Sequence, residues 1–356
     1  MKHICLTGLI VFSVVLGFTQ QEGQGLPEDY DPSPRGEDGL RLMFYNVENL
    51  FDTQDDTLKR DEEFLPDGAR NWNSYRYWEK INHLASVIVS IGGWEPPAVV
   101  GLCEVENLNA LKALFYGSGL KKYQYEIVHY ESPDVRGIDN ALAYQKKKLT
   151  LLHSEAIPVF LGNKYKRPTR DILYVKMKTL TNDTLHIFVN HWSSRWGGEE
   201  ATRPKRIQAA QALRSVIDSL EAIPHEQNIV IMGDFNDTPE NESIYKTLMA
   251  RDSAANTYLV NLMRPWLSAN KGTHFYKEAT GAQWSILDQI IVSRPLLNPG
   301  GLKTSSRAHI FDADFLMTED DGVRKPHRSF LGFKYIGGYS DHLPIYIDVF
   351  HLSKFD

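Results

Sequence analysis

The chain has 356 residues, of which 42% are hydrophobic and 24% are charged, with a formal net charge of −6. This is the composition of an ordinary globular protein that can bury a sizeable core, in one large domain or two modest ones. The small negative charge excludes any requirement for a polyanionic partner held by long-range attraction, although it leaves room for a local basic patch.

The first 24 residues have the pattern of a secretory signal peptide. Lys2 and His3 precede an apolar stretch at 4–18, and polar residues follow it from Gln20. The apolar stretch is shorter than the roughly 20 residues that a membrane-spanning helix needs. We therefore expect export, cleavage between residues 17 and 25, a periplasmic or extracellular location, and no stable membrane anchor.

The rest of the chain is predicted to be a linker over residues 25–39 and a single domain over residues 40–356. The linker contains three prolines and too little apolar surface to pack. Cleavage would leave Cys103 as the one cysteine, so we expect no intramolecular disulfide and, in its apolar surroundings, a buried thiol. The sequence has no obvious zipper or excess apolar face, and a monomer is the expected state.

Helical and extended patterns alternate along this domain. Apolar residues recur at helical spacing from Tyr77 to Ile91 and from Ile207 to Leu220, where Thr202 is a candidate cap and Pro204 fits a first turn. Nearly continuous apolar runs are typical of strands buried on both faces, so we predict an α/β (α+β) sandwich of two packed sheets flanked by helices. The predicted strands are 40–47, 98–103, 125–129, 141–145, 172–177, 186–190, 229–232, 286–292 and 345–350.

One apolar strand, in the run IVIMGDFNDT, ends with Asp234 and Asn236. Because side chains alternate along a strand, these two face one way while Phe235 faces the other. Gly233 lets the backbone leave the strand, which predicts that the carboxylate and the amide project together into one site. A turn in which both side chains cap backbone amides explains this segment equally well when it is considered alone.

Four other apolar runs meet the same kinds of side chain at their ends. Isolated polar residues at strand ends usually form turns or caps, but that explanation would have to hold independently for each run, whereas a shared site needs one cause. The residues are Asn46 and Glu48 in MFYNVENLFD, Glu104 in GLCEVEN, His191 in FVNHWSS, and Asp341 with His342 in YSDHLPIYIDV.

Taken in order, these motifs resemble the endonuclease/exonuclease/phosphatase superfamily, the deoxyribonuclease I-like metal-dependent phosphoesterases. The resemblance covers nearly all of the predicted mature chain. It implies a four-layered α/β sandwich with the active site where the ends of the two sheets meet. The motifs that carry it are YNVEN, CEVEN, NHWSS, GDFND, LDQIIVS with Asp288, and SDHLP.

A divalent metal ion is expected from the chemistry and from the resemblance. Hydrolysis of an anionic phosphodiester needs charge neutralisation and an aligned water, and hard oxygen ligands suit Mg²⁺ or Mn²⁺. Glu104 is the principal expected ligand, with the Asn46 oxygen beside it, and Glu48 is a further candidate. A solvated salt bridge explains Glu48 about as well. Asp341 is expected to support either the metal or the loop of His342.

The resemblance also implies roles in catalysis. Asp234 would accept a proton from the attacking water or orient it, and Asn236 would donate to a phosphoryl oxygen. His342 would act as an imidazolium opposite the scissile phosphate, with Asp288 fixing its orientation and raising its pKa. His191 would supply a second imidazole, as a phosphate ligand or a general acid; the alternative is a core histidine satisfied by the backbone.

Two arginines are candidate phosphate ligands. Arg170 begins a predicted strand and Arg136 precedes another, and a guanidinium matches two phosphate oxygens at once. A surface ion pair explains either residue about as well.

The acidic segment 52–67 is predicted to be a surface insertion. Residues 312–338 depart from the superfamily's nucleases and are predicted to form a lid or rim.

These observations predict a hydrolase that acts on phosphoric ester bonds. The leading hypothesis is an exported Mg²⁺-dependent endonuclease or exonuclease, although the sequence has no dense Lys/Arg track for DNA. The first alternative is a phosphatase or phosphodiesterase for a small phosphorylated or lipid substrate, such as an inositol phosphate, a nucleotide or sphingomyelin. The second is a catalytically silent binding protein, which the complete set of polar residues disfavours.

Overall fold

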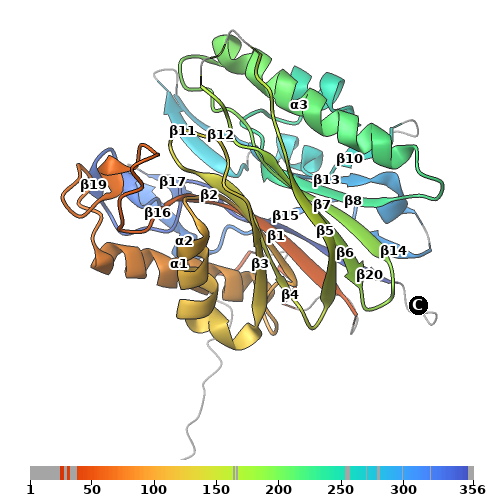
Figure 1. Ribbon diagram of the computed structural model, residues 1–356, viewed down its shortest axis with the longest axis horizontal. Coiled ribbons are helices and arrows are strands. Elements are labelled where there is room, and N and C mark those ends of the chain that lie inside the picture. The colour runs from red at the N-terminus through yellow and green to blue at the C-terminus, as the bar shows by residue number, and fades with distance from the viewer. Residues whose placement is uncertain are drawn as a thin grey trace, which may run out of the picture.

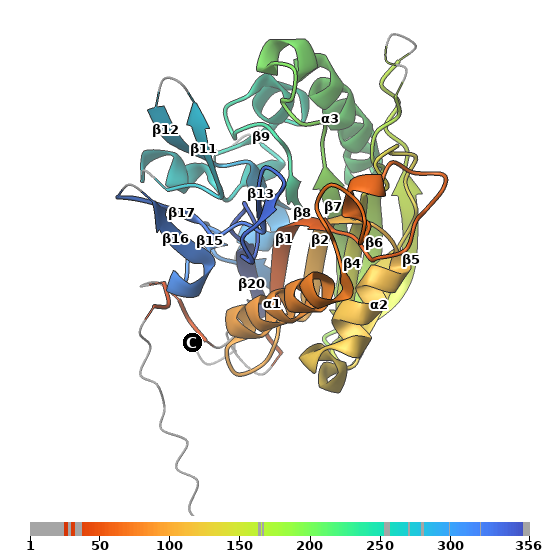
Figure 2. The same cartoon turned by 90° about the vertical axis from the view of Figure 1, so that its left-hand side faces the viewer.

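Two β-sheets pack face to face at the centre of the computed structural model, and helices cover their outer faces (Figure 1). Figure 2 shows α1 and α2 against one sheet and α3 against the other. This is the predicted four-layered α/β sandwich. The structure describes residues 25–27, 30–32, 38–162, 165, 167–252, 257–269, 271–278, 281–298, 300–320 and 322–351. The predicted signal peptide lies outside the described residues.

The first sheet contains the N-terminal and C-terminal strands of the domain side by side. Its central strands β1 and β2 are parallel, and the other neighbours along it are antiparallel. Chain segments about 300 residues apart therefore meet at its middle, where Leu42 pairs with Ile347. The order is β14 (Leu302–Thr304), β20 (Ile345–His351), β1 (Leu40–Leu50), β2 (Val99–Val105), β4 (Asp139–Gln145) and β3 (Tyr125–His129), with β15 (His309–Ile310) also paired to β20.

The second sheet has the same mixed character. Its strands β7 and β8 are parallel and its other major pairs are antiparallel. The two short strands at its edge, β10 and β9, are again parallel. The order is β5 (Leu149–Ile157), β6 (Ile172–Thr179), β7 (Thr184–His191), β8 (Asn228–Asp234), β13 (Asp288–Ser293), β10 (Leu259–Asn261) and β9 (Ala250–Arg251).

Buried aliphatic side chains fill the space between the sheets. Strands β8 and β13 are buried along almost their whole length, as their continuous apolar runs predict. The sheets are closely packed at Gly101 of β2, because a Cβ atom there would lie 2.7 Å from the Met232 sulfur. Cys103 is buried and free, as expected.

In the described part of the chain, three α-helices cover the sandwich: α1 (Ser74–Gly92), α2 (Leu108–Gly117) and α3 (Glu199–Glu221). Both predicted helices are present, but the expected start of the second is wrong. Gly198 is the N-cap of α3, whereas the Thr202 hydroxyl lies inside the helix and donates to the Gly198 carbonyl oxygen at 2.8 Å. Pro204 accordingly lies beyond the first turn. None of the described helices combines the length and apolar character needed to cross a bilayer.

Short hairpins extend from one side of the sandwich, and β11–β12 and β16–β17 lie close together there (Figure 2). They are β11 (His274–Glu278) with β12 (Gly281–Ser285), β16 (Met317–Asp320) with β17 (Val323–Pro326), and β18 (Phe330–Leu331) with β19 (Lys334–Tyr335). Short 3₁₀ turns are found at Glu62–Phe64, Gly119–Tyr123, Arg264–Ser268, Arg294–Leu297 and Asp314–Leu316, and a π turn at Ser243–Thr247.

All nine predicted strands exist, but two expectations about the rest of the chain need correction. The predicted linker was expected not to pack, yet the Tyr30 hydroxyl donates to the Ser90 carbonyl oxygen at 2.6 Å and its ring contacts Phe311. The acidic segment 52–67 is also more than a surface insertion. Its Phe64 is buried and stacks on Phe51.

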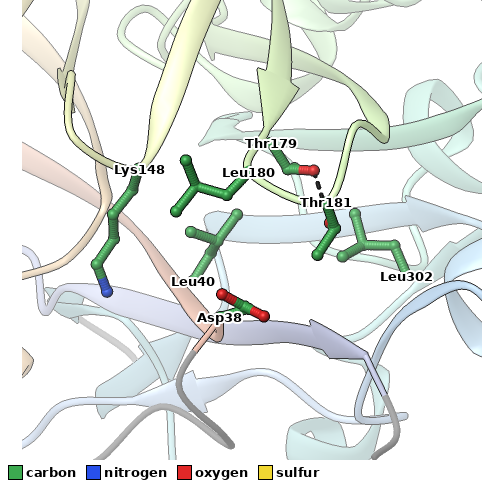
Figure 3. Close-up of a pocket in the computed structure, with 7 residues that line it drawn as sticks. All are labelled: Asp38, Leu40, Lys148, Thr179, Leu180, Thr181 and Leu302. Carbon is green, nitrogen blue, oxygen red and sulfur yellow. Dashed lines mark hydrogen bonds between the residues drawn. The ribbon is translucent and has the colours of Figure 1, made fainter.

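A small pocket lies at one end of the sandwich (Figure 3). It is lined by Leu40, where β1 begins, and by Thr179, where β6 ends. Asn46 and His191 lie near the other ends of β1 and β7, so this pocket is separate from the predicted site. Its other lining residues are Asp38, Lys148, Leu180, Thr181 and Leu302.

Candidate active site

The polar residues at the strand ends meet at one end of the sandwich. His191 and Asp234 are the last residues of the parallel strands β7 and β8 and pair in register, and Asp288 begins β13 opposite Asp234. The Asn46 side-chain amide, from the other sheet, donates to Asp234 Oδ2 at 3.1 Å. This hydrogen bond joins two side chains that are 188 residues apart in the sequence. A shared site is therefore a better explanation of the motifs than independent turns and caps.

His342 forms a buried ion pair with Asp288. Its Nδ1 lies 2.7 Å from Asp288 Oδ2, and its Nε2 lies 3.8 Å from Asp234 Oδ2. Burial would lower the pKa of His342, but the carboxylates of Asp288 and Asp234 outweigh burial and raise that pKa well above its usual value. The raised pKa favours the imidazolium form of His342, and Nε2 is the ring nitrogen on the side of Asp234.

Asp234 is held by hydrogen bonds at both oxygens. Besides the Asn46 amide at Oδ2, the backbone N–H of Asn236 donates to Oδ1 at 2.9 Å, because Asn236 adopts a left-handed conformation with φ of 51°. Burial, together with the charges of Asp288 and Glu104, raises the pKa of Asp234 to about 7, although His342 acts in the opposite direction. A carboxylate with a pKa near neutrality is well matched to accepting a proton from water.

Asn236 also binds the loop that follows His191. Its side-chain amide donates to the Trp192 carbonyl oxygen at 3.1 Å, and Arg195 donates to the Asn236 carbonyl oxygen at 2.7 Å. Asp234 and His191 are adjacent strand ends, so these bonds fix two parts of the site relative to each other. Trp196, in the same loop, is highly exposed.

His191 is enclosed between two carboxylates. Its Nε2 lies 3.7 Å from Glu104 Oε1 and 3.8 Å from Asp234 Oδ2, while its Nδ1 is buried with no hydrogen-bond partner in the described structure. Burial, and after it the charges of Arg170 and Arg136, lower the pKa of His191 well below its usual value. A neutral imidazole is a poor general acid near pH 7, so of the two predicted roles the geometry favours phosphate ligand.

The expected metal ligands lie on bulged strand ends. Glu48 and Glu104 both have left-handed backbone conformations, with φ of 48° and 62°, which L-residues adopt at a cost and which are common at functional sites. Glu104 Oε2 accepts a hydrogen bond from the Asn49 backbone at 3.0 Å. Asn46 Oδ1 accepts one from the Glu48 backbone at 3.0 Å.

Glu48 and Asp341 share a cationic partner. Arg328 lies 2.9 Å from Asp341 Oδ2 through Nη2 and 3.5 Å from Glu48 Oε1 through Nε. Burial and the charge of Asp341 raise the pKa of Glu48 to about 7, despite opposing effects of Lys80 and Arg328. Burial also opposes ionisation of Asp341, but His342 and Arg328 outweigh it and lower the pKa of that carboxyl group.

The donor set suits a hard divalent cation. Carboxylate and amide oxygens are the ligands that Mg²⁺ and Mn²⁺ prefer, and Mg²⁺ typically takes one or two carboxylates and keeps several waters. Glu104 fits this requirement because its carboxylate has no Lys or Arg partner among the described residues and lies beside the neutral His191. A divalent ion bound there would be held by Glu104 and the Asn46 oxygen.

The comparisons with known proteins identify the family of this chain. The profile of the Endonuclease/Exonuclease/phosphatase family matches residues 41–351. The chain belongs to this family. Among curated protein sequences no match was found. The family membership of the chain confirms the prediction of a hydrolase that acts on phosphoric ester bonds with a divalent metal ion.

Solved structures of the endonuclease/exonuclease/phosphatase family share its fold. A family protein from Bacteroides thetaiotaomicron is similar with a TM-score of 0.56 and 16% identity, over 87% of this chain and 97% of that one. A mannosyl-6-phosphatase of the same organism has a TM-score of 0.55 and 14% identity, over 87% and 99%. TDP2 of D. rerio complexed with a single-strand DNA product has a TM-score of 0.54 and 15% identity, over 88% and 99%.

The two arginines differ in their positions in this endonuclease/exonuclease/phosphatase domain. Arg170 is buried and donates to Asp134 Oδ2 at 3.0 Å and to the Trp192 carbonyl oxygen at 2.6 Å. With both terminal nitrogens bound to protein atoms, it braces the loop after His191 and is poorly placed to contact phosphate. Arg136 is about half exposed and lies 3.6 Å from Asp134, so it stays the better candidate for a phosphate contact.

Several side chains of the site escaped prediction from the sequence. Lys80 lies on the apolar face of α1, three residues after Tyr77, and a charged residue at such a position was an available signal. Thr273 Oγ1 accepts a hydrogen bond from the Asp288 backbone at 3.0 Å, and the His274 ring lies 4.6 Å from the His342 ring. Neither of these two residues belongs to a motif that the sequence reveals.

Proposed function

We propose that this protein is an exported, Mg²⁺-dependent phosphodiesterase that acts on nucleic acid. The observation that carries the proposal is that a proton-accepting carboxylate and a cationic imidazole face each other in the site. Asp234, with a pKa raised to about 7, faces the His342 imidazolium at 3.8 Å, and His191 Nε2 lies between Asp234, at 3.8 Å, and the carboxylate of Glu104, at 3.7 Å. The site therefore offers a proton acceptor, a cation and a metal ligand at once.

Each of these residues has a separate role in hydrolysis. Asp234 orients the attacking water and takes its proton at a carboxylate oxygen, while the bonds from Asn46 and Asn236 keep that carboxylate in place. His342 directs its Nε2–H to a phosphoryl oxygen and stabilises the charge that develops there, and Asp288 holds it protonated. A bound Mg²⁺ would neutralise phosphate charge and stabilise the leaving oxygen.

Two considerations support nucleic acid as the substrate and export as the destination. TDP2, whose fold is similar, is known in complex with a single-strand DNA product. The N-terminal residues have the charge and hydropathy pattern of a signal peptide. The fold similarity to a mannosyl-6-phosphatase makes a small phosphate monoester the second candidate substrate.

An assay panel with Mg²⁺ or with chelator tests the proposal. It contains single-stranded and plasmid DNA, RNA, bis-p-nitrophenyl phosphate, p-nitrophenyl phosphate, mannose 6-phosphate, inositol phosphates and sphingomyelin. We expect chelator-sensitive cleavage of DNA or RNA and of the synthetic diester, with at least a hundredfold loss in Asp234→Asn. Turnover of monoesters or lipid alone would contradict the nucleic-acid assignment. Undiminished activity of Asp234→Asn would contradict the mechanism.

Fractionation tests export separately. Cells that produce the full chain should contain a processed form outside the cytoplasm, with its new N-terminus between residues 18 and 25. A full-length chain confined to the cytoplasm would contradict the predicted location.

A further inference from the structure

The segment between β17 and β20 places an arginine over two acidic residues of the active site. Arg328 Nη2 donates to Asp341 Oδ2 at 2.9 Å, and its Nε lies 3.5 Å from Glu48 Oε1. The next residue strengthens the contact, since the Ser329 backbone N–H donates to Glu48 Oε2 at 2.6 Å. Both oxygens of Glu48 therefore face groups from this one segment.

A buried lysine holds the same segment from below. Lys80 Nζ, on α1, donates to Ser329 Oγ at 2.6 Å and to the Tyr339 carbonyl oxygen. Its ammonium group also interacts electrostatically with Glu48, with Asp341 and, to a smaller extent, with Glu104. Two carboxylates at the edge of the site are thus matched by two protein cations, one of which is a guanidinium that stays protonated at any pH where proteins fold.

Glu104 is left in a different situation. It has no Lys or Arg within ion-pair distance in the part of the chain that the structure describes, and its nearest ring nitrogen is His191 Nε2, 3.7 Å from Oε1. Glu48 and Asp341 cannot bind a metal ion through the oxygens that face Arg328 unless the guanidinium moves away. The same site therefore contains one carboxylate without a Lys or Arg at ion-pair distance and two that share Arg328.

We propose that Arg328 is a fixed cation of the active site that takes the place of a second divalent ion. The enzyme then binds a single ion, through Glu104 and Asn46. In this proposal Glu48 and Asp341 position Arg328, in place of the ligand roles that the sequence predicts for them. The inference rests on the divalent-ion chemistry of the proposed function and is independent of which phosphate ester is the substrate.

Arg328 has the geometry that such a role requires. Its side chain is 42% exposed although it contacts the buried carboxylate of Glu48 as well as Asp341, which is 22% exposed, so it lies at the boundary between the protein and the substrate side of the site. Arg328 contacts Asp341, which immediately precedes the catalytic His342 in the sequence. A latch that only closed the fold would need neither this exposure nor contact with two carboxylates of the site.

Counting bound Mn²⁺ by electron paramagnetic resonance, with the full chain and without substrate, tests the inference. Wild type should bind one ion in the site, and Glu104→Gln should weaken that binding by about 10- to 100-fold, whereas Glu48→Gln should leave it within about twofold. Arg328→Ala should bind two ions, because Glu48 and Asp341 are then released. The double variant Arg328→Ala/Glu48→Gln should return to one.

A neighbouring arginine supplies the matched control. Arg324 lies on β17, pairs with Asp314 at 2.6 Å and is exposed, so Arg324→Ala should bind one ion like wild type. Arg328→Gln, which keeps a polar side chain of similar length, serves as the second variant if Arg328→Ala does not fold, as judged by circular dichroism. It should also bind two ions.

The outcomes separate this inference from the proposed function. A wild type that binds two ions, one lost in Glu104→Gln and one in Glu48→Gln, overturns the inference and leaves the proposed function intact. Folded Arg328 variants that still bind a single ion overturn it as well. A wild type that binds no Mn²⁺ overturns the divalent-ion chemistry and the inference together.

Discussion

Replacing Asp288 with Asn tests the central electrostatic element of the site. The substitution keeps the size of the side chain but removes the negative charge that lies 2.7 Å from His342 Nδ1. That charge raises the pKa of both His342 and Asp234. Its removal should therefore lower both pKa values and move the whole pH–activity profile to lower pH, because His342 must be protonated and Asp234 must be ionised.

The size of the shift can be bounded from the geometry. A hydrogen bond to a charged group contributes about 1 kcal/mol more than a neutral one, which corresponds to a little under one pKa unit. The Coulomb attraction of two unit charges about 4 Å apart at an effective dielectric constant near 20 is about 4 kcal/mol, or roughly three units. We expect the alkaline limb of the profile to fall by about one to three units, and the acidic limb by less, since Asp288 faces His342 directly.

The measurement is kcat/KM for bis-p-nitrophenyl phosphate with Mg²⁺ between pH 5 and 10, together with NMR titration of the His342 ring. The matched control is Asp183→Asn, which makes the same charge change at another His–Asp pair, with His351 at 2.8 Å, remote from the site. It should leave the profile unchanged. An alkaline limb of Asp288→Asn that stays within about 0.3 units of wild type would refute the reasoning.

Three further predictions concern single residues. Asp234→Asn should reduce kcat by about 10²- to 10⁴-fold with an unchanged circular dichroism spectrum, and a loss below tenfold would exclude it as the base. Arg206→Met breaks the buried ion pair with Asp237, whose atoms are 2.7 Å apart, and should lower the free energy of unfolding in urea by about 3–5 kcal/mol. Burial lowers the pKa of His186 to about 4, so the unfolded chain takes up its proton first and stability should fall as pH drops from about 6.5 to about 4. His186→Phe, measured by urea midpoints across that range, should show a smaller dependence on pH, and an identical slope would contradict the assignment.

The strands and the principal site residues were predictable because their signals are local. Side-chain alternation places Asp234 and Asn236 on one side of a strand end, and the register of the sheet confirms that Asp234 lies beside His191 and opposite Asp288. Strand β5 escaped prediction because it is an edge strand whose middle is exposed, so it lacks the apolar run that marked the others. The helix α3 was predicted, but its N-cap was assigned to the wrong residue because Gly198 has no side chain that could mark it as a cap.

The surroundings of these residues were not predictable in the same way. Whether Glu48 binds metal or forms an ion pair depends on Arg328, 280 residues later in the chain, and on Lys80 from a helix. Whether His191 can act as an acid depends on burial and on Arg170, which no spacing in the sequence reveals. The hydrogen bond between the Asn46 and Asp234 side chains likewise joins the two sheets, and the motifs do not specify how those sheets pack.

The order and type of residues along each strand therefore determined which chemical groups this protein brings to its active site, because strand geometry alone fixes the direction in which each side chain points. Only the tertiary structure decided the charge that each group carries there and the partner that each one binds. Ionisation depends on burial and on neighbours within a few ångströms, and in this fold those neighbours come from distant parts of the chain.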